Sequence, residues 1–207
     1  ELYLGERQRG RSAMESSNLQ RCGWCKGDAL YQRYHDEVWG VPERDDRVLF
    51  EFLLLEGAQA GLNWITILRK RENYRAAFDG FDAEKIARYD DQKKHALLTN
   101  SGIVRNRLKI DSAIGNAQQF LRIKESGESF RDYLWAFVDG KTVQNRYVNL
   151  NDVPSNTALS NAMSKQMKRD GFKFVGSTIC YAFMQATGMV NDHLLSCHRH
   201  SQCLALT

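Results

Sequence analysis

Apolar residues recur at helical spacing along most of the chain. Residues 105–124, RNRLKIDSAIGNAQQFLRIK, carry apolar side chains at a period close to 3.6. Comparable patterns, several with an acid or a serine at the start, predict helices within 48–60, 64–78, 82–89, 91–98, 129–138, 155–171 and 172–189. We therefore expect an all-α fold of about eight to ten helices.

Glycines and polar runs mark the segments outside these helices. Gly57 and Gly61 are expected to loosen the chain between the predicted helices within 48–60 and 64–78, and Gly171 is expected to follow a helix end. Residues 140–150, GKTVQNRYVNL, resemble a hairpin or an irregular loop. Residues 1–20 are polar and rich in Arg and Ser, which predicts a disordered tail or a remnant of cloning, followed by a single helical domain over 21–207.

Composition supports an ordinary globular protein. The 207 residues are 43% hydrophobic and 26% charged, with only two prolines, which excludes collagen-like, disulfide-knot and globally disordered classes. No apolar run approaches the length of a membrane span, and the N-terminus has no apolar signal core. We expect a cytoplasmic protein with no membrane partner.

Net charge differs between the two halves. Residues 1–100 hold 16 basic and 17 acidic side chains, a net charge of −1, whereas residues 101–207 hold 13 and 8, a net charge of +5. A polyanionic partner would suit the second half. A solvated basic face explains the same numbers equally well.

Cysteine and histidine gather near both ends of the predicted domain. The cysteines are Cys22, Cys25, Cys180, Cys197 and Cys203. Their odd number suits a reducing compartment. The i, i+4 spacing of His193 and Cys197 would place them on one helix face, where with Cys22 and His35 they could form a structural zinc site. Free thiols and surface histidines are as good an interpretation. Cys22 and Cys25 also form C-x-x-C, but no preceding strand supports a redox centre.

Three further features point to chemistry. Glu56 lies late in an apolar helix, where an unpaired carboxylate is costly, although it could instead point into water. Leu62 lies at a break between helices and could enter a DNA base stack, or simply pack in the core. Residues 172–178 form a short turn before a helix, whose N-terminus could bind a phosphate; most such turns bind nothing.

Taken in order, the strings along the chain resemble the bacterial-type 3-methyladenine DNA glycosylase I family. They are RCGW (21–24), LYQRYHDEVWGVP (30–42), LEGAQAGLNWITIL (55–68), KRENYRAAF (70–78), SGIVRNRLKI (101–110) and GFKFVGSTICYAFMQATGMVNDH (171–193). The resemblance implies a helix-hairpin-helix DNA glycosylase fold. It also implies a monomeric, monofunctional enzyme that flips 3-methyladenine out of alkylated duplex DNA and hydrolyses its glycosidic bond, leaving an abasic site. A non-catalytic damage sensor and a zinc-stabilised interaction protein are the alternatives.

The resemblance also assigns roles to residues. It implies one structural Zn²⁺ that joins the terminal segments through Cys22, His35, His193 and Cys197, and it leaves Cys25 outside the set. The pocket carboxylate, and the catalytic candidate, is Glu56. The implied base-binding aromatics are Tyr34, Trp64, Trp24, Tyr31 and Trp39. The implied DNA contacts are Gly61, the wedge Leu62, Lys173, Val175, Gly176, Ser177 and Thr178. Asp192 adjoins a ligand position and is given no catalytic role.

Overall fold

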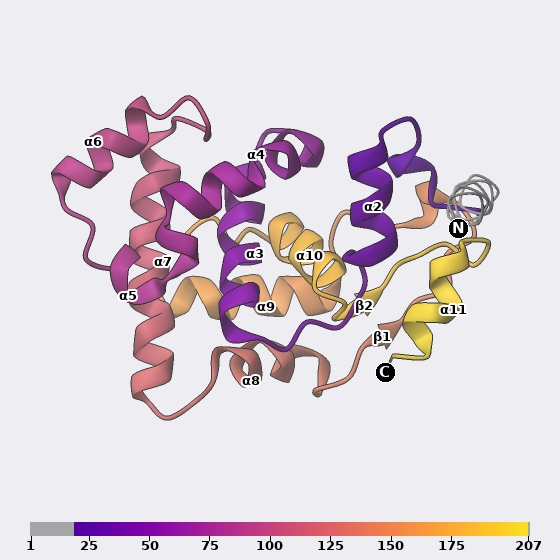
Figure 1. Ribbon diagram of the computed structural model, residues 1–207. Helices are drawn as coiled ribbons and strands as arrows, with labels where there is room; N and C mark the ends of the chain where they lie inside the picture. Colours follow the sequence, from indigo (N-terminus) through magenta and orange to yellow (C-terminus); the bar gives the residue numbers. More distant parts are fainter. Residues whose placement is uncertain (1–18, 207) are drawn as a thin grey trace, which may run out of the picture.

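The computed structural model describes residues 19–206, and most of that range is α-helical (Figure 1). The helices are α2 (Ala29–Glu37), α3 (Asp46–Gln59), α4 (Trp64–Ala77), α5 (Ala83–Ile86), α6 (Asp91–Thr99), α7 (Arg107–Glu125), α8 (Phe130–Trp135), α9 (Ala158–Arg169), α10 (Ser177–Ala186) and α11 (His198–Leu204). The 3-10 turns are Gly23–Cys25, Asp79–Phe81, Ala136–Val138 and Leu150–Asp152. The predicted mostly helical chain is confirmed.

Helix α3 lies at the centre of the molecule (Figure 1) and is buried from Leu49 to Ala58. It contacts α4, α7, α8 and α10, which explains why it is apolar on nearly every side. Gly57 does not loosen it, contrary to the sequence prediction. A Cβ at Gly57 would lie 3.3 Å from the Cβ of Phe174, so glycine here allows α3 to approach the turn before α10.

Polar side chains begin most of these helices at the predicted places. Asp45 accepts hydrogen bonds from the N–H groups of Arg47 and Val48 at the start of α3, and Ser129 accepts one at the start of α8. Such caps satisfy donors that a helix leaves free at its N-terminus. At the other end of α9, Gly171 adopts φ +92° as predicted.

Helices α9 and α10 pack together as a hairpin, and the turn between them is held by α7. The side chain of Asn116 accepts from the Lys173 N–H (2.8 Å) and donates to the Lys173 carbonyl (3.0 Å). Ser164 of α9 donates to the Val175 carbonyl at 2.6 Å. The helix-hairpin-helix element is thus anchored on both sides of its turn.

Residues 140–150 were predicted as a hairpin or an irregular loop, and they do not form a hairpin. Strand β1 (Val143–Gln144) pairs in parallel with β2 (Val190–Asn191). The pairing is non-local, because β1 and β2 are 47 residues apart at each paired position (Val143 with Val190, Gln144 with Asn191). No helix of residues 19–206 is long and apolar enough to cross a bilayer.

The first and last described segments lie on the same side of the molecule (Figure 1). The carbonyl of Gln20 accepts the backbone N–H of His198 at the start of α11 (2.9 Å). The predicted tail over 1–20 otherwise falls outside the described residues.

Candidate functional site: an aromatic pocket beside a buried Cys/His cluster

A cavity of about 370 Å³ opens between α2, α3, α4, α10 and the 150–154 segment. This volume is in the range of small-molecule sites. All five predicted base-binding aromatics line it, together with the predicted carboxylate. The lining residues are Trp24, Tyr31, Tyr34, Trp39, Glu56, Gln59, Trp64, Leu150, Val153, Pro154, Ala182, Gln185 and Asp192.

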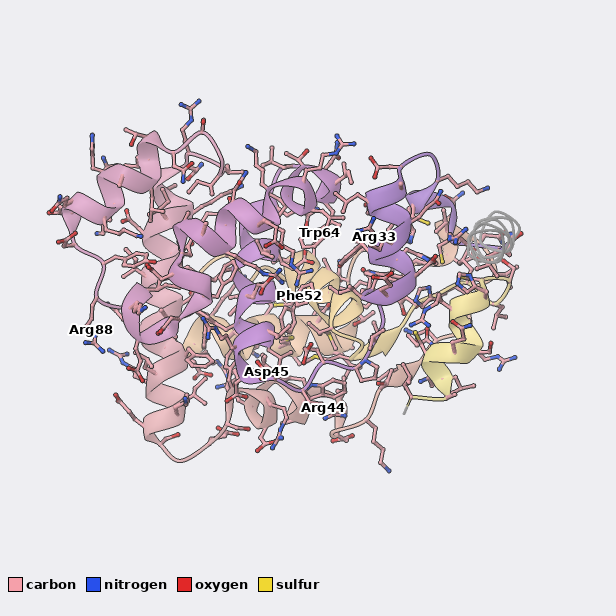
Figure 2. All side chains as sticks on the ribbon, viewed as in Figure 1. Arg33, Arg44, Asp45, Phe52, Trp64 and Arg88 are labelled. Atoms are coloured by element: carbon pink, nitrogen blue, oxygen red, sulfur yellow. The ribbon has the colours of Figure 1, made fainter. Side chains whose placement is uncertain are left out.

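The aromatic rings form one connected cluster. The ring of Trp24 lies 4.8 Å from Tyr31 and 5.1 Å from Trp39, centroid to centroid, and Tyr34 lies 5.5 Å from Trp64. Figure 2 shows Trp64 at the start of α4, on the side that faces α2. Because the rings pack against one another, their orientations are fixed before any ligand arrives.

Glu56 is buried in this cavity, with 3% of its surface exposed. Burial raises the pKa of its carboxyl group to about 8, because no nearby cation offsets the cost of ionisation. Its Oε2 atom has no hydrogen-bond partner among the described residues, and neither has Nε1 of Trp64. Unpaired buried polar atoms are costly, so this pocket wall is prepared for a ligand with both donors and acceptors. The alternative of a solvent-exposed Glu56 is wrong.

The sequence prediction left out several pocket residues, and Asp192 is the most polar of them. Asp192 is buried and accepts hydrogen bonds from the Tyr181 hydroxyl, from Gln185 (2.9 Å) and from Asn145 (2.6 Å). It follows β2 directly, and successive side chains of an extended segment point to opposite sides. Asp192 can therefore line the pocket although His193 faces the other way, so proximity to a ligand position was no reason to set it aside.

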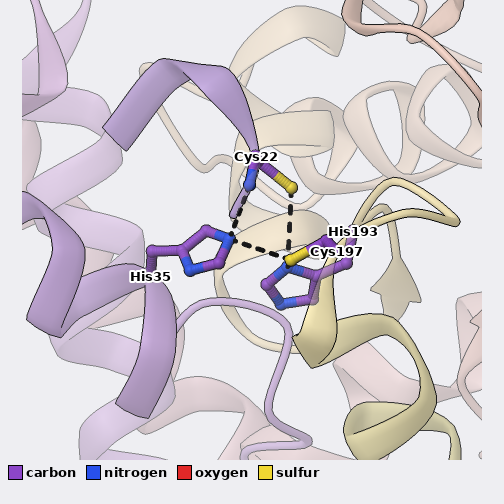
Figure 3. Close-up of side chains that lie close together, drawn as sticks. All are labelled: Cys22, His35, His193 and Cys197. Atoms are coloured by element: carbon purple, nitrogen blue, oxygen red, sulfur yellow. Dashed lines mark hydrogen bonds between the residues drawn. The ribbon is translucent and has the colours of Figure 1, made fainter. Parts of the chain in front are cut away.

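The four predicted metal ligands come together (Figure 3), and the two imidazoles contact the pocket rings of Trp24 and Trp39. The donor atoms of Cys22, His35, His193 and Cys197 all lie within 4.8 Å of one another, and all four residues are buried. The sulfur of Cys197 lies 3.4 Å from His35 Nε2 and 3.6 Å from His193 Nδ1. One prediction is wrong in its geometry, since His193 and Cys197 do not share a helix. A turn closed by the Cys197 N–H and the Leu194 carbonyl brings them together, and α11 begins after it.

Both imidazoles are oriented by a second hydrogen bond. His35 donates from Nδ1 to Asp36 (2.7 Å), which in turn pairs with Arg21 (2.8 Å). His193 donates from Nε2 to the Trp39 carbonyl (3.0 Å). Each ring therefore presents its unprotonated nitrogen to the sulfurs, the arrangement typical of metal-binding histidines. Cys25 lies outside the cluster and donates to the Cys22 carbonyl at 3.2 Å, so the donor set fits one tetrahedral ion.

Comparison with known proteins agrees with this geometry. The family model for methyladenine glycosylase matches residues 24–200. The chain belongs to the methyladenine glycosylase family. It is 50% identical over 179 residues to DNA-3-methyladenine glycosylase 1 of Escherichia coli, covering 86% of this chain and 96% of that protein. Members of this family are hydrolases that act on N-glycosyl bonds.

Solved structures of methyladenine glycosylases share the fold. A crystal structure of 3-methyladenine DNA glycosylase I superimposes with a TM-score of 0.85 at 52% identity, covering 86% of this chain and 98% of that one. A tyrosine-to-phenylalanine variant of 3-methyladenine DNA glycosylase I, solved in complex with 3-methyladenine, gives 0.83 at 36% identity, with 86% and 96% covered.

Two surface elements of this family member carry the predicted DNA contacts. Leu62 is 41% exposed at the tip between α3 and α4, beside Gly61 at φ +78°. In the hairpin, Lys173 and Thr178 are exposed and Gly176 is the N-cap of α10.

The side chains of Val175 and Ser177 are not placed to contact DNA. The side chain of Val175 is buried. The hydroxyl of Ser177 bonds to Asn161 and lies 3.0 Å from the Ser160 hydroxyl of α9. Only their backbone groups remain for a phosphate.

Proposed function

We propose that this protein is a monofunctional glycosylase that removes 3-methyladenine from alkylated duplex DNA. The flipped base enters the aromatic pocket and an abasic site is left. The observation that carries the proposal is the buried carboxyl of Glu56 beside unpaired polar atoms in a wall of aromatic rings. A relative with the same fold was solved in complex with 3-methyladenine.

Recognition follows from the charge of the damaged base. As a nucleotide, 3-methyladenine is cationic, and the faces of Trp and Tyr attract a cation by roughly 0.5–2 kcal/mol. Glu56 accepts hydrogen bonds from the base and becomes ionised when the cation is bound, because an adjacent positive charge stabilises the carboxylate. Undamaged adenine lacks this charge and gives the desolvated Glu56 no counter-charge, so the pocket binds it less well.

Bond cleavage needs little acid catalysis. The alkylated base carries a positive charge, so the electrons of the breaking glycosidic bond neutralise the leaving group. Water then adds to the cationic sugar carbon and loses one proton to solvent, and the products are the free base and an abasic site. Among residues 19–206 no lysine lines the pocket, so none is placed to form a Schiff base, which supports the monofunctional reaction.

DNA binding uses the two surface elements. Leu62 fills the gap left by the extruded base, as apolar wedges do. The N-terminus of α10, with Gly176 as its cap, offers backbone N–H groups to a phosphate, and Lys173 adds positive charge. The more basic second half of the chain suits this role.

The Cys/His cluster would hold one Zn²⁺ through Cys22, His35, His193 and Cys197. A zinc ion with four protein ligands has no open position for water, so it serves structure. Here it would connect Cys22 and helix α2, through His35, with the segment before α11, and so stabilise the back wall of the pocket.

The test is release of free bases from methylated duplex DNA. Glu56→Gln and Trp64→Ala are each expected to lower kcat/KM for 3-methyladenine about 10-fold or more, since one removes the counter-charge and the other a ring face. Glu84→Gln on the exposed surface of α5 is the matched control and should retain wild-type release. Equal activity in all four proteins would contradict the pocket assignment. Tight binding to methylated DNA without release by the wild type would indicate a damage sensor instead.

A further inference from the structure

A lysine from α7 holds the end of helix α3. The ammonium group of Lys109 lies 2.7 Å from the Ala58 carbonyl and 2.7 Å from the Ala60 carbonyl. These are carbonyls of the last turn of α3 and of its C-cap. The next two residues are Gly61 and Leu62, the exposed tip between α3 and α4.

The contact pairs carbonyl groups that the end of a helix leaves without partners. The last carbonyls of a helix have no partner within the helix and carry the negative end of its dipole, which a cation stabilises. Lys109 is itself well anchored, because its backbone N–H donates to Asn106, the cap of α7 (3.1 Å). The two carbonyl contacts hold the ammonium group between α3 and α7, although partial burial lowers its pKa.

The tip has little other support. Leu62 donates its N–H to the Gln59 carbonyl (2.6 Å), and the Gln59 side chain donates to the Leu62 carbonyl (3.3 Å). Both bonds join Leu62 only to the last residue of α3. Lys109, in contrast, connects the start of the tip to α7, the 19-residue helix that packs against α3, α5 and α6.

We propose that Lys109 is a positioning residue for the wedge. It holds the start of the 60–62 tip so that Leu62 keeps its place when it is pressed into the DNA base stack. The inference rests on the proposed function, because it assigns a role within base flipping. Glu56 lies farther back in regular helix, and Trp64 after the tip begins α4 and packs against the ring of Tyr34. Both are therefore expected to keep their places in the pocket without Lys109.

A double-mutant cycle separates this role from general stability. Lys109→Met keeps the aliphatic chain but removes both hydrogen bonds, and it is combined with Leu62→Ala. We expect each single variant to lower kcat/KM for base release from methylated duplex about 5–20-fold. The double variant should fall no more than about 2-fold below Leu62→Ala alone, because both substitutions impair the same wedge.

Two further measurements accompany the cycle. Affinity for free 3-methyladenine, followed by tryptophan fluorescence, should stay within about 2-fold of wild type in Lys109→Met. Lys109→Arg, which keeps charge and donors, should recover most of the duplex activity, and Lys109→Gln replaces the methionine variant if that one unfolds. Lys94→Met is the matched control, since Lys94 is another half-buried lysine that pairs with α7, at Asp111 (3.3 Å), and it should behave as wild type.

Three outcomes would overturn the inference. Additive losses in the double variant, an equal loss of free-base affinity, or an equal effect of Lys94→Met would each show that Lys109 does not act through Leu62. If the wild type releases no base, the proposed function fails and the inference with it. If the wild type releases base normally and any of the three outcomes is found, the role of Lys109 is refuted and the proposed function stands.

Discussion

Glu56 carries a carboxyl group whose burial is costly for the free protein and useful for binding a cationic base. Its carboxyl is buried, lacks a partner at Oε2 and has a pKa near 8. The free protein at neutral pH therefore holds it mainly protonated. We expect a cationic base to reverse that preference, so that its binding is coupled to the release of a proton. Glu51, also buried on α3, contrasts with it because Arg71 and Arg75 pair with it at 2.6 and 2.9 Å.

The raised pKa of Glu56 predicts a pH-dependent stability. The folded protein binds this proton up to about pH 8, whereas the unfolded chain loses it near 4.5. The associated stability is therefore complete below pH 4.5 and is lost as pH rises through 8. Glu56→Gln should flatten this fall and raise the free energy of unfolding at pH 8 by roughly 4 kcal/mol. Urea unfolding from pH 5 to 8.5 measures it, with Glu84→Gln as control; parallel curves for wild type and Glu56→Gln would contradict it.

At the scale of elements, the α9–α10 hairpin is positioned by a helix distant in sequence. Asn116 is 2% exposed and satisfies both backbone groups of Lys173, 57 residues along the chain. The turn also contains Phe174 at φ +55°, a conformation that is uncommon outside glycine. External hydrogen bonds therefore help to keep this turn, and with it the start of α10, in a defined place.

Removing that support should weaken DNA binding without changing the pocket. Asn116→Ala is expected to destabilise the protein by about 2 kcal/mol, since it leaves the backbone N–H and carbonyl of Lys173 without their partner. We also expect a loss of affinity for duplex DNA of about 3–10-fold, while affinity for free 3-methyladenine is retained. Fluorescence anisotropy and chemical denaturation measure these effects. Gln118→Ala, on the exposed side of α7, is the control, and DNA affinity equal to wild type in Asn116→Ala would rule out this role.

At the scale of the whole molecule, the pocket lies where the two ends of the described chain meet. Cys22 and His35 come from the start of the described residues, and His193 and Cys197 from their end. The parallel pairing of β1 with β2 connects a third segment to the same region. A bound ion here would close a very long loop, which removes much of the conformational freedom of the unfolded chain.

Loss of the ion should therefore affect the whole protein. We expect about one zinc per chain in the wild type and none in Cys197→Ser. The variant should unfold at a temperature lower by at least about 5 °C, because metal binding contributes to folding. Elemental analysis and thermal unfolding measure both. Cys180→Ala, at a buried cysteine outside the cluster, should keep its zinc, whereas full zinc retention in Cys197→Ser would disprove the ligand set.

The amino-acid sequence by itself determined the helices, several of their caps and the identity of the pocket aromatics, Glu56 and the four Cys/His residues. Periodicity and capping act over a few neighbouring residues, and the family's strings are contiguous, so both can be read along the chain. Only the tertiary structure decided that Glu56 is buried, that Asp192 lines the pocket, that β1 pairs with β2 and that Lys109 holds the end of α3. Each of these depends on a contact between segments far apart in sequence, where burial and hydrogen bonding are set by packing rather than by local pattern.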